Sequence, residues 1–226
     1  MNKKEIKWII KGEVIKMKDL DLFFAYEFVS GFIPFLIVLA VFTYSRKKKG
    51  LSISKISCVM LVIFSIYIIN VYHLTSVGTI YNVLTYKLEI RKDLINLIPF
   101  SNDIYFIGYL LNVVLFIPLG ILAPLIFKKM DKLKYIFGAG LGFSMFIELS
   151  QLLNNRSTDI DDLILNTVGA IIGFALYKIF DKCTNSKYDL NDKIPMVIMI
   201  ISILVMFIGR FLFFNQMGLA RLLYGF

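Results

Sequence analysis

The sequence contains few of the residues that build metal centres and nucleophilic active sites. Its 226 residues include two cysteines, one histidine and one tryptophan. Cys58 falls in an apolar segment and Cys183 in a basic loop, so neither a disulfide framework nor a cysteine-based metal site is expected. No serine or cysteine has a partner that would activate it as a nucleophile, which disfavours acyl-enzyme chemistry.

Acidic charge is scarce as well. Lys and Arg number 25 against 16 Asp and Glu, which gives a formal net charge of +9. The basic residues sit in short loops between apolar segments, where they set the orientation of membrane proteins. This placement favours membrane topology and contact with anionic lipid headgroups, and no nucleic-acid partner is expected.

Long polar stretches, which a soluble module would need, are missing. Hydrophobic residues make up 58% of the chain, and the mean hydropathy is +0.75. A chain of this length has room for about six membrane spans and short loops. We therefore predict an all-α, polytopic transmembrane helical bundle that forms one domain over residues 22–226. The predicted spans are 22–44, 56–80, 105–127, 135–153, 163–180 and 194–214.

Residues 1–21 are predicted to form a separate amphipathic segment. Apolar residues recur there at roughly helical spacing with lysines between them, which is typical of a helix lying on the membrane surface. A partner-binding helix is the alternative. The segment has no continuous apolar core of the kind that a cleavable signal peptide requires.

The basic loops predict an orientation. Loops 45–55, 128–134 and 181–193 are rich in Lys and are expected in the cytoplasm. Loop 154–162 carries one positive and three negative residues and is expected outside the cell. The Lys-rich N-terminus opposes this orientation, because six spans would place it outside as well.

Polar side chains collect near the outer side of this predicted bundle. Ionisable groups at the edge of a membrane core are costly, so a group of them is a candidate site. Helical spacing places Glu148 and Gln151 on one face of the fourth span. It also places Asp159, Asp162 and Asn166 on one face of the fifth. Below them, Gly138-x-x-x-Gly142 and Gly169-x-x-x-Gly173 are expected to let these two spans pack closely.

These residues suggest two sets of roles. The candidate catalytic residues are Glu148, Asp159, Asp162 and His73, and the candidate substrate-binding residues are Asn112, Gln151, Arg156 and Asn166. Glu148 is the first choice for a general base, because burial makes a carboxylate a better proton acceptor. The acidic and amide oxygens suit a divalent cation such as Mg²⁺, and Arg156 with the start of the fifth helix suits phosphate.

Structural explanations remain open for most of these residues. Asp159 suits the N-cap of the fifth helix, and Arg156 can pair with Glu148 or an aspartate as a clasp. A lone histidine in a span, such as His73, is more often a packing residue. Glu27 and Arg210 are explained by side chains that reach to the interface.

The polar residues fall in linked motifs that resemble the VanZ-like family over roughly residues 94–180. The motifs are Asn96-Leu97-Ile98-Pro99-Phe100, Asn112-Val113-Val114-Leu115-Phe116-Ile117-Pro118-Leu119-Gly120, Glu148-x-x-Gln151 and Arg156-x-x-Asp159-x-x-Asp162-x-x-x-Asn166-x-x-Gly169-x-x-x-Gly173. The resemblance implies a multi-pass protein of the bacterial cell membrane. Founding members of the family confer low-level resistance to the glycopeptide teicoplanin, by a mechanism that is not established.

Three functions are compatible with this resemblance. The first is an outward-facing site that binds or acts on an envelope lipid or a lipid-linked, phosphate-bearing precursor. The second is a non-catalytic scaffold or lipid-binding module whose polar cluster is structural. A transporter is less favoured, because the sequence shows no inverted repeat and its polar residues gather on one side of the membrane.

Overall fold

The computed structural model describes residues 8–10, 13–15, 17–51, 53–87, 94–101, 106–154, 156–184 and 194–224. Six of its helical segments are long and apolar enough to cross a membrane, which confirms the predicted bundle. The helices are α1 (Met17–Lys48), α2 (Lys55–Thr75), α3 (Ile80–Tyr86), α4 (Phe106–Ile126), α5 (Leu133–Gln151), η2 (Leu152–Asn154), α6 (Ile160–Cys183), α7 (Met196–Phe213) and α8 (Gln216–Tyr224).

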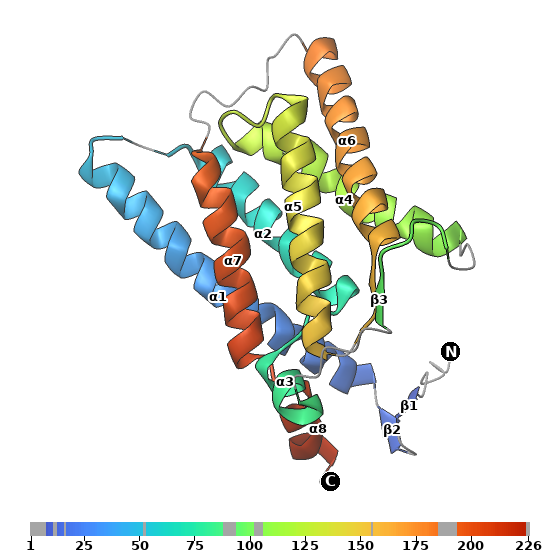
Figure 1. Cartoon of the computed structure of the whole chain (residues 1–226). Coiled ribbons are helices and arrows are strands. Elements are labelled where there is room, and N and C mark those ends of the chain that lie inside the picture. The colour runs from blue at the N-terminus through green and yellow to red at the C-terminus, as the bar shows by residue number, and fades with distance from the viewer. Residues whose placement is uncertain are drawn as a thin grey trace, which may run out of the picture.

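The bundle is organised around α2. Leu61, Phe64 and Ile68 of this helix are fully buried, and Tyr72 donates a hydrogen bond of 2.8 Å to the carbonyl of Ile203 in α7. On one side, α1 packs along α7, and on the other, α6 packs along α4 and α5 (Figure 1). Because α2 contacts α1, α4 and α7, it joins the two sides into one core.

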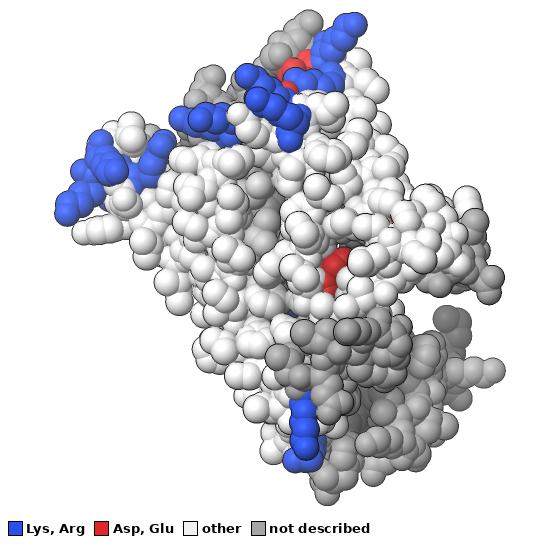
Figure 2. Space-filling model, viewed as in Figure 1, with Lys and Arg blue, Asp and Glu red and all other residues white. Residues whose placement is uncertain are grey.

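Basic residues mark one end of the bundle. Lys and Arg gather at the end where α1 and α6 finish and where α5 and α7 begin (Figure 2). At this end the loop after α4 contacts the start of α7, through Lys128 N to Ile194 O at 2.8 Å and Ile194 N to Ile126 O at 2.9 Å. The basic loops 45–55 and 128–134, and the flanks of 181–193, therefore share one end, as the sequence predicts.

Glycines set the closest helix contact, and this contact differs from the predicted one. A Cβ added to Gly169 would lie 2.1 Å from the carbonyl oxygen of Val113, and one added to Gly173 would lie 2.0 Å from that of Ile117. Both carbonyls belong to α4, so these glycines pack against the third span instead of the fourth. The contact predicted for Gly138 and Gly142 is wrong, because nothing lies within 4 Å of a Cβ at either position. A glycine spacing alone does not say which neighbour the helix meets.

The N-terminal segment also needs correction. Instead of a helix over residues 1–21, the described residues show β1 (Trp8–Ile10) and β2 (Glu13–Ile15) paired antiparallel, and α1 begins at Met17. Aromatic and β-branched residues such as Trp8, Ile9 and Ile10 favour strands, and Gly12 lowers the helix propensity between them. The remainder of this predicted helix up to residue 16 lies outside the described residues.

Candidate functional site

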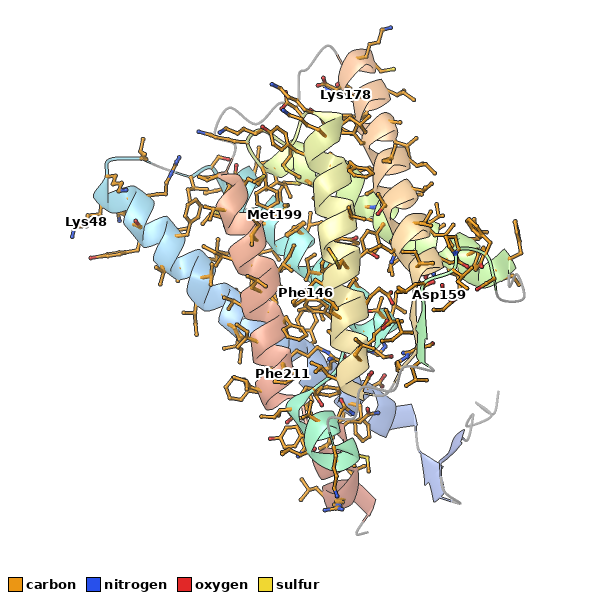
Figure 3. The ribbon with its side chains drawn as sticks, in the orientation of Figure 1. Lys48, Phe146, Asp159, Lys178, Met199 and Phe211 are labelled. Carbon is orange, nitrogen blue, oxygen red and sulfur yellow. The ribbon has the colours of Figure 1, made fainter. Side chains whose placement is uncertain are left out.

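The site begins where a short parallel strand pair fixes the start of α6. Strand β3 (Ile95–Asn96) pairs with β4 (Thr158–Asp159), with Asn96 opposite Asp159. The Asn96 amide donates a hydrogen bond of 3.1 Å to Asp159 Oδ2. Asp159 is the N-cap of α6, and its Oδ1 accepts from the backbone N–H of Asp161 at 2.9 Å. Figure 3 labels Asp159 at this junction of β4 and α6.

Asp161 ties the segment before α4 to the same helix start. Its side chain is 1% exposed, and its Oδ1 accepts from the backbone N–H of Phe100 at 2.8 Å. Its Oδ2 accepts from the Tyr109 hydroxyl in α4 at 2.5 Å. The sequence analysis assigned no role to Asp161. The structure shows instead that it docks the Asn96–Phe100 motif and the first turn of α4 onto α6.

Two further carboxylates lie deeper, between α4, α5 and α6. Glu148 of α5 is 5% exposed, and its Oε2 accepts from the backbone N–H of Asp159 at 3.1 Å. Asp162 of α6 accepts a hydrogen bond from the side-chain amide of Asn112 in α4. Glu148 and Asp162 are close enough to interact electrostatically with each other and with Arg156. The structure thus brings together Asn112, Glu148, Asp159 and Asp162, as the sequence predicts.

Asn166 extends this site one turn farther into the bundle. It is 2% exposed and donates a hydrogen bond of 3.0 Å to Ser144 Oγ of α5. Its Oδ1 has no hydrogen-bond partner among the described residues. A buried amide oxygen that accepts no hydrogen bond destabilises the folded protein, so this oxygen is suited to accept one from a ligand or a water.

Gln151 and Arg156 lie beside the carboxylates but bond to α2. Gln151 Nε2 donates to the carbonyl of Thr75 at 2.8 Å, and Arg156 Nη1 reaches the same oxygen at 3.4 Å. Asn154 donates to the neighbouring carbonyl of Ser76 at 2.7 Å. These side chains satisfy the free carbonyls at the C-terminal end of α2. Arg156 forms no ion pair with Glu148 or Asp162 in the described part of the chain, and its side chain stays exposed.

His73 belongs to a different cluster. Its Nδ1 lies 2.6 Å from Glu27 Oε2, and Arg210 Nε donates to Glu27 Oε1 at 2.7 Å. Arg210 also donates to the carbonyl of Val77 at 2.6 Å. Because Glu27 and Arg210 are each 5% exposed, the interpretation that they reach to the interface is wrong. No described contact places His73 against the carboxylates of the site, and its catalytic role stays a prediction.

The positions of the acidic side chains can be compared with the expectation that they bind a divalent cation. Within the described ranges, no group of three or more His, Cys, Asp or Glu side chains is placed to hold a metal ion. Two of the acidic oxygens at the start of α6 accept from Asn96 and from the backbone N–H of Asp161. These carboxylates also occupy the helix N-terminus that was expected to attract phosphate. What remains is a set of free acceptor oxygens with an arginine beside them.

Several contributors to the site went unassigned in the sequence analysis. Asn96 was noted only as part of a motif, and Tyr109 not at all. Ser144 carried one usable signal, because it lies four residues before Glu148 and so shares its helix face. The contacts of Asn96 and Tyr109 are formed with residues more than 50 positions away. Such contacts cannot be read from local spacing.

Comparison with known proteins gives consistent matches. A family model described as VanZ/LLP1 matches residues 32–181. The chain is similar to Protein VanZ of Enterococcus faecium, with 31% identity over 145 residues that cover 64% of this chain and 86% of that protein. No solved structure matches the chain. The matched range contains the carboxylate site and His73, while Glu27 and Arg210 lie outside it.

Proposed function

The chain belongs to the VanZ/LLP1 family, and from this membership we propose that it is a cell-envelope membrane protein that lowers susceptibility to teicoplanin. Its similarity to Protein VanZ supports the link to this antibiotic. We further propose that its polar site faces outward and binds the head of an envelope lipid or of a phosphate-bearing lipid precursor. The basic opposite end of the bundle supports this orientation, since Lys-rich loops favour the cytoplasm.

The observation that carries the proposal is the set of unused acceptors between α4, α5 and α6. Among the described residues, Glu148 Oε1 and Asp162 Oδ2 have no hydrogen-bond partner, and neither does Asn166 Oδ1. Acceptors of this kind suit a ligand rich in donors, such as the hydroxyls of a sugar or an amine. The exposed guanidinium of Arg156 is suited to the phosphate of the same ligand.

A structural role is the alternative, and particular contacts favour it for part of the cluster. Asp159 caps α6, and both oxygens of Asp161 accept hydrogen bonds from the chain. These two residues fix the architecture whether or not a ligand binds. Glu148, Asp162 and Asn166 each keep an oxygen free, so they are the residues whose substitution separates the two functions.

The test is expression in a glycopeptide-sensitive Gram-positive host, with teicoplanin inhibitory concentration and membrane protein level as readouts. We expect the wild type to raise tolerance, and Glu148→Gln and Asp162→Asn to abolish the increase at equal protein level. Asp131→Asn is the matched control, because Asp131 is an exposed acid in the basic loop between α4 and α5. If both site variants keep full tolerance, the polar site has no part in it.

A further inference from the structure

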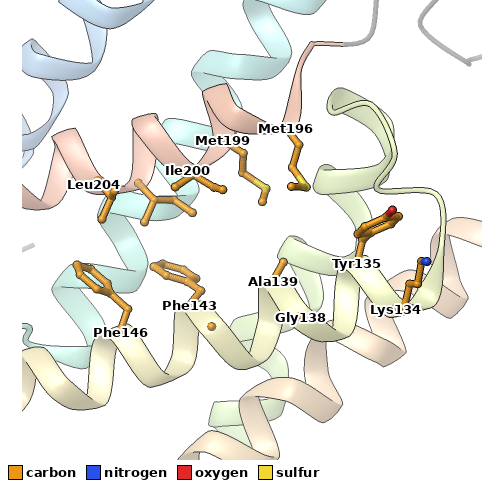
Figure 4. A pocket seen from close by; sticks show the side chains of 12 residues that line it. Lys134, Tyr135, Gly138, Ala139, Phe143, Phe146, Met196, Met199, Ile200 and Leu204 are labelled. Carbon is orange, nitrogen blue, oxygen red and sulfur yellow. The ribbon is translucent and has the colours of Figure 1, made fainter.

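A groove between α5 and α7 lies at the basic end of the bundle and shares no residue with the polar site. It has a volume of about 450 Å³, and its walls are almost entirely apolar (Figure 4). Phe143 and Phe146 line one side, and Met199 and Leu204 line the other. Lys134 stands at its mouth. In a membrane protein, the expected occupant of such a groove is a hydrocarbon chain with a polar head at the mouth.

The length of the groove matches one leaflet of a bilayer. On α5 it runs from Lys134 to Phe146, which at the rise of an α-helix is about 18 Å. A hydrocarbon core of about 30 Å gives each leaflet roughly 15 Å. Beyond Phe146 the helices close, because its ring contacts that of Phe207 in α7 with centroids 4.8 Å apart. The groove therefore has an open polar end and a closed apolar end.

Two glycines keep the groove open. Gly138 and Gly142 both line it, and a Cβ at either would meet nothing within 4 Å. By contrast, a Cβ on Gly140, on the other face of α5, would lie 2.9 Å from the Cβ of Ala170. Small residues at Gly138 and Gly142 are thus not needed for contact between helices. They leave room for something outside the chain.

The positive charge at the mouth of the groove favours a lipid with an anionic headgroup. Lys134 follows Lys128, Lys129 and Lys132 in the loop between α4 and α5, against the single acid Asp131. Basic residues at this depth attract anionic lipid headgroups. Lys134 also lies over the ring of Tyr135, with its Nζ 5.1 Å from the ring centroid. That contact holds the ammonium group near the groove.

We propose that this groove binds one acyl chain of an anionic glycerophospholipid from the leaflet at the basic end, with the lipid phosphate at Lys134. The site is separate from the proposed function, because neither its residues nor its end of the bundle are shared with the carboxylates.

The experiment uses the purified full-length protein. The protein is reconstituted in vesicles of equal parts phosphatidylglycerol and phosphatidylethanolamine, extracted in mild detergent and examined by native mass spectrometry. We expect the wild type to retain one phosphatidylglycerol molecule. Gly142→Leu, which fills the groove, should lose bound lipid of both kinds. Lys134→Gln should still bind a lipid but lose the preference for phosphatidylglycerol.

Two matched controls lie on α6 outside the groove. Ala175→Leu introduces the same side chain at an exposed position, and Lys178→Gln removes a charge at the same end of the bundle. Both should retain phosphatidylglycerol like the wild type. Equal retention by the wild type and all four variants would overturn the proposal. A second result would also overturn it: a wild type that is dimeric, and a Gly142→Leu variant that is monomeric but binds the same amount of lipid. The groove would then be an interface between copies of the chain.

Discussion

Asp161 connects three parts of the chain through one buried carboxylate. It accepts hydrogen bonds from the backbone of Phe100 and from the hydroxyl of Tyr109, and it sits in the first turn of α6. Together these contacts hold the segment before α4 against the start of α6, next to Glu148 and Asp162. The geometry of the polar site therefore depends on a residue that does not keep an oxygen free for a ligand.

The contacts of Asp161 predict a loss of stability on truncation. Asp161→Ala should lower the free energy of unfolding by about 1–3 kcal/mol, because it removes charge-assisted hydrogen bonds and leaves their donors unpaired. Asp161→Asn should cost less, since it keeps one acceptor in place. Thermal unfolding in detergent, followed by circular dichroism, measures both. Unchanged unfolding of Asp161→Ala would mean that the Asn96–Phe100 segment is held by other contacts.

The free oxygen of Asn166 predicts a different response. Asn166→Leu removes a buried acceptor that has no partner, but it also breaks the hydrogen bond to Ser144. Asn166→Asp keeps the acceptors and adds a charge beside Glu148 and Asp162, so it should destabilise the protein more than Asn166→Leu does. The same thermal measurement ranks the two variants, with Ser144→Ala as the control that removes only the partner hydroxyl. The opposite ranking would show that this part of the bundle tolerates charge.

Among the helices, α4 and α6 form the tightest pair, and their glycines are the reason. Gly169→Ala and Gly173→Ala place a methyl group about 2 Å from backbone carbonyls of α4, so each should destabilise the protein by about 1–3 kcal/mol. Gly142→Ala meets no atom within 4 Å and should be neutral or stabilising by up to about 1 kcal/mol. Unfolding in denaturant compares the three, and similar values for all would contradict this packing.

At the scale of helices, the sequence predicts which segments form spans, and how deep a residue lies in them, better than it predicts which helices pack against each other. Hydropathy located the six spans found among the described residues, and helical spacing correctly placed Glu148 and Gln151 on one buried face. It did not say which helix faces which, so Gly169 and Gly173 were assigned to the fourth span when they meet the third. Local spacing repeats along one helix, whereas the choice of partner depends on the packing of the whole bundle.

The orientation of the whole molecule is open to direct measurement. Cys183 is exposed at the end of α6, on the basic side, and Ser157 is exposed in the segment between η2 and β4. Two variants are compared, both carrying Cys58→Ser. In the first, which also carries Cys183→Ser and Ser157→Cys, an impermeant maleimide should label the new cysteine in intact cells. In the second, it should label native Cys183 only after permeabilisation. The reverse pattern would place the polar site in the cytoplasm and overturn its proposed outward orientation.

The first and last spans are joined by a charged contact that the sequence could not predict. Glu27 and Arg210 are 183 positions apart, and each taken alone is explained by a place near the interface. Only the bundle brings them together, with Gly209 packed against Ser30 and Pro34 of α1. A single sequence gives the depth of a charged residue in the membrane. It does not give its position around the bundle.

This buried ion pair predicts strong coupling between α1 and α7. Arg210→Met should cost about 3–5 kcal/mol of folding free energy, because it leaves the buried Glu27 without its guanidinium and with only His73 beside it. The double variant Glu27→Leu, Arg210→Met should cost less than the sum of the single changes. Thermal unfolding of the four proteins gives the coupling energy. Additive effects would show that the two side chains do not depend on each other.

The same contact has a consequence for how the chain is made. Glu27 enters the membrane with α1, and Arg210 arrives only when α7 is synthesised, 183 positions later. Throughout that interval Glu27 has only His73 of α2 as a partner and lacks its guanidinium, and a carboxylate in the bilayer without a full counter-charge is disfavoured. A truncated or stalled chain therefore carries Glu27 without the guanidinium that pairs with it in the complete bundle.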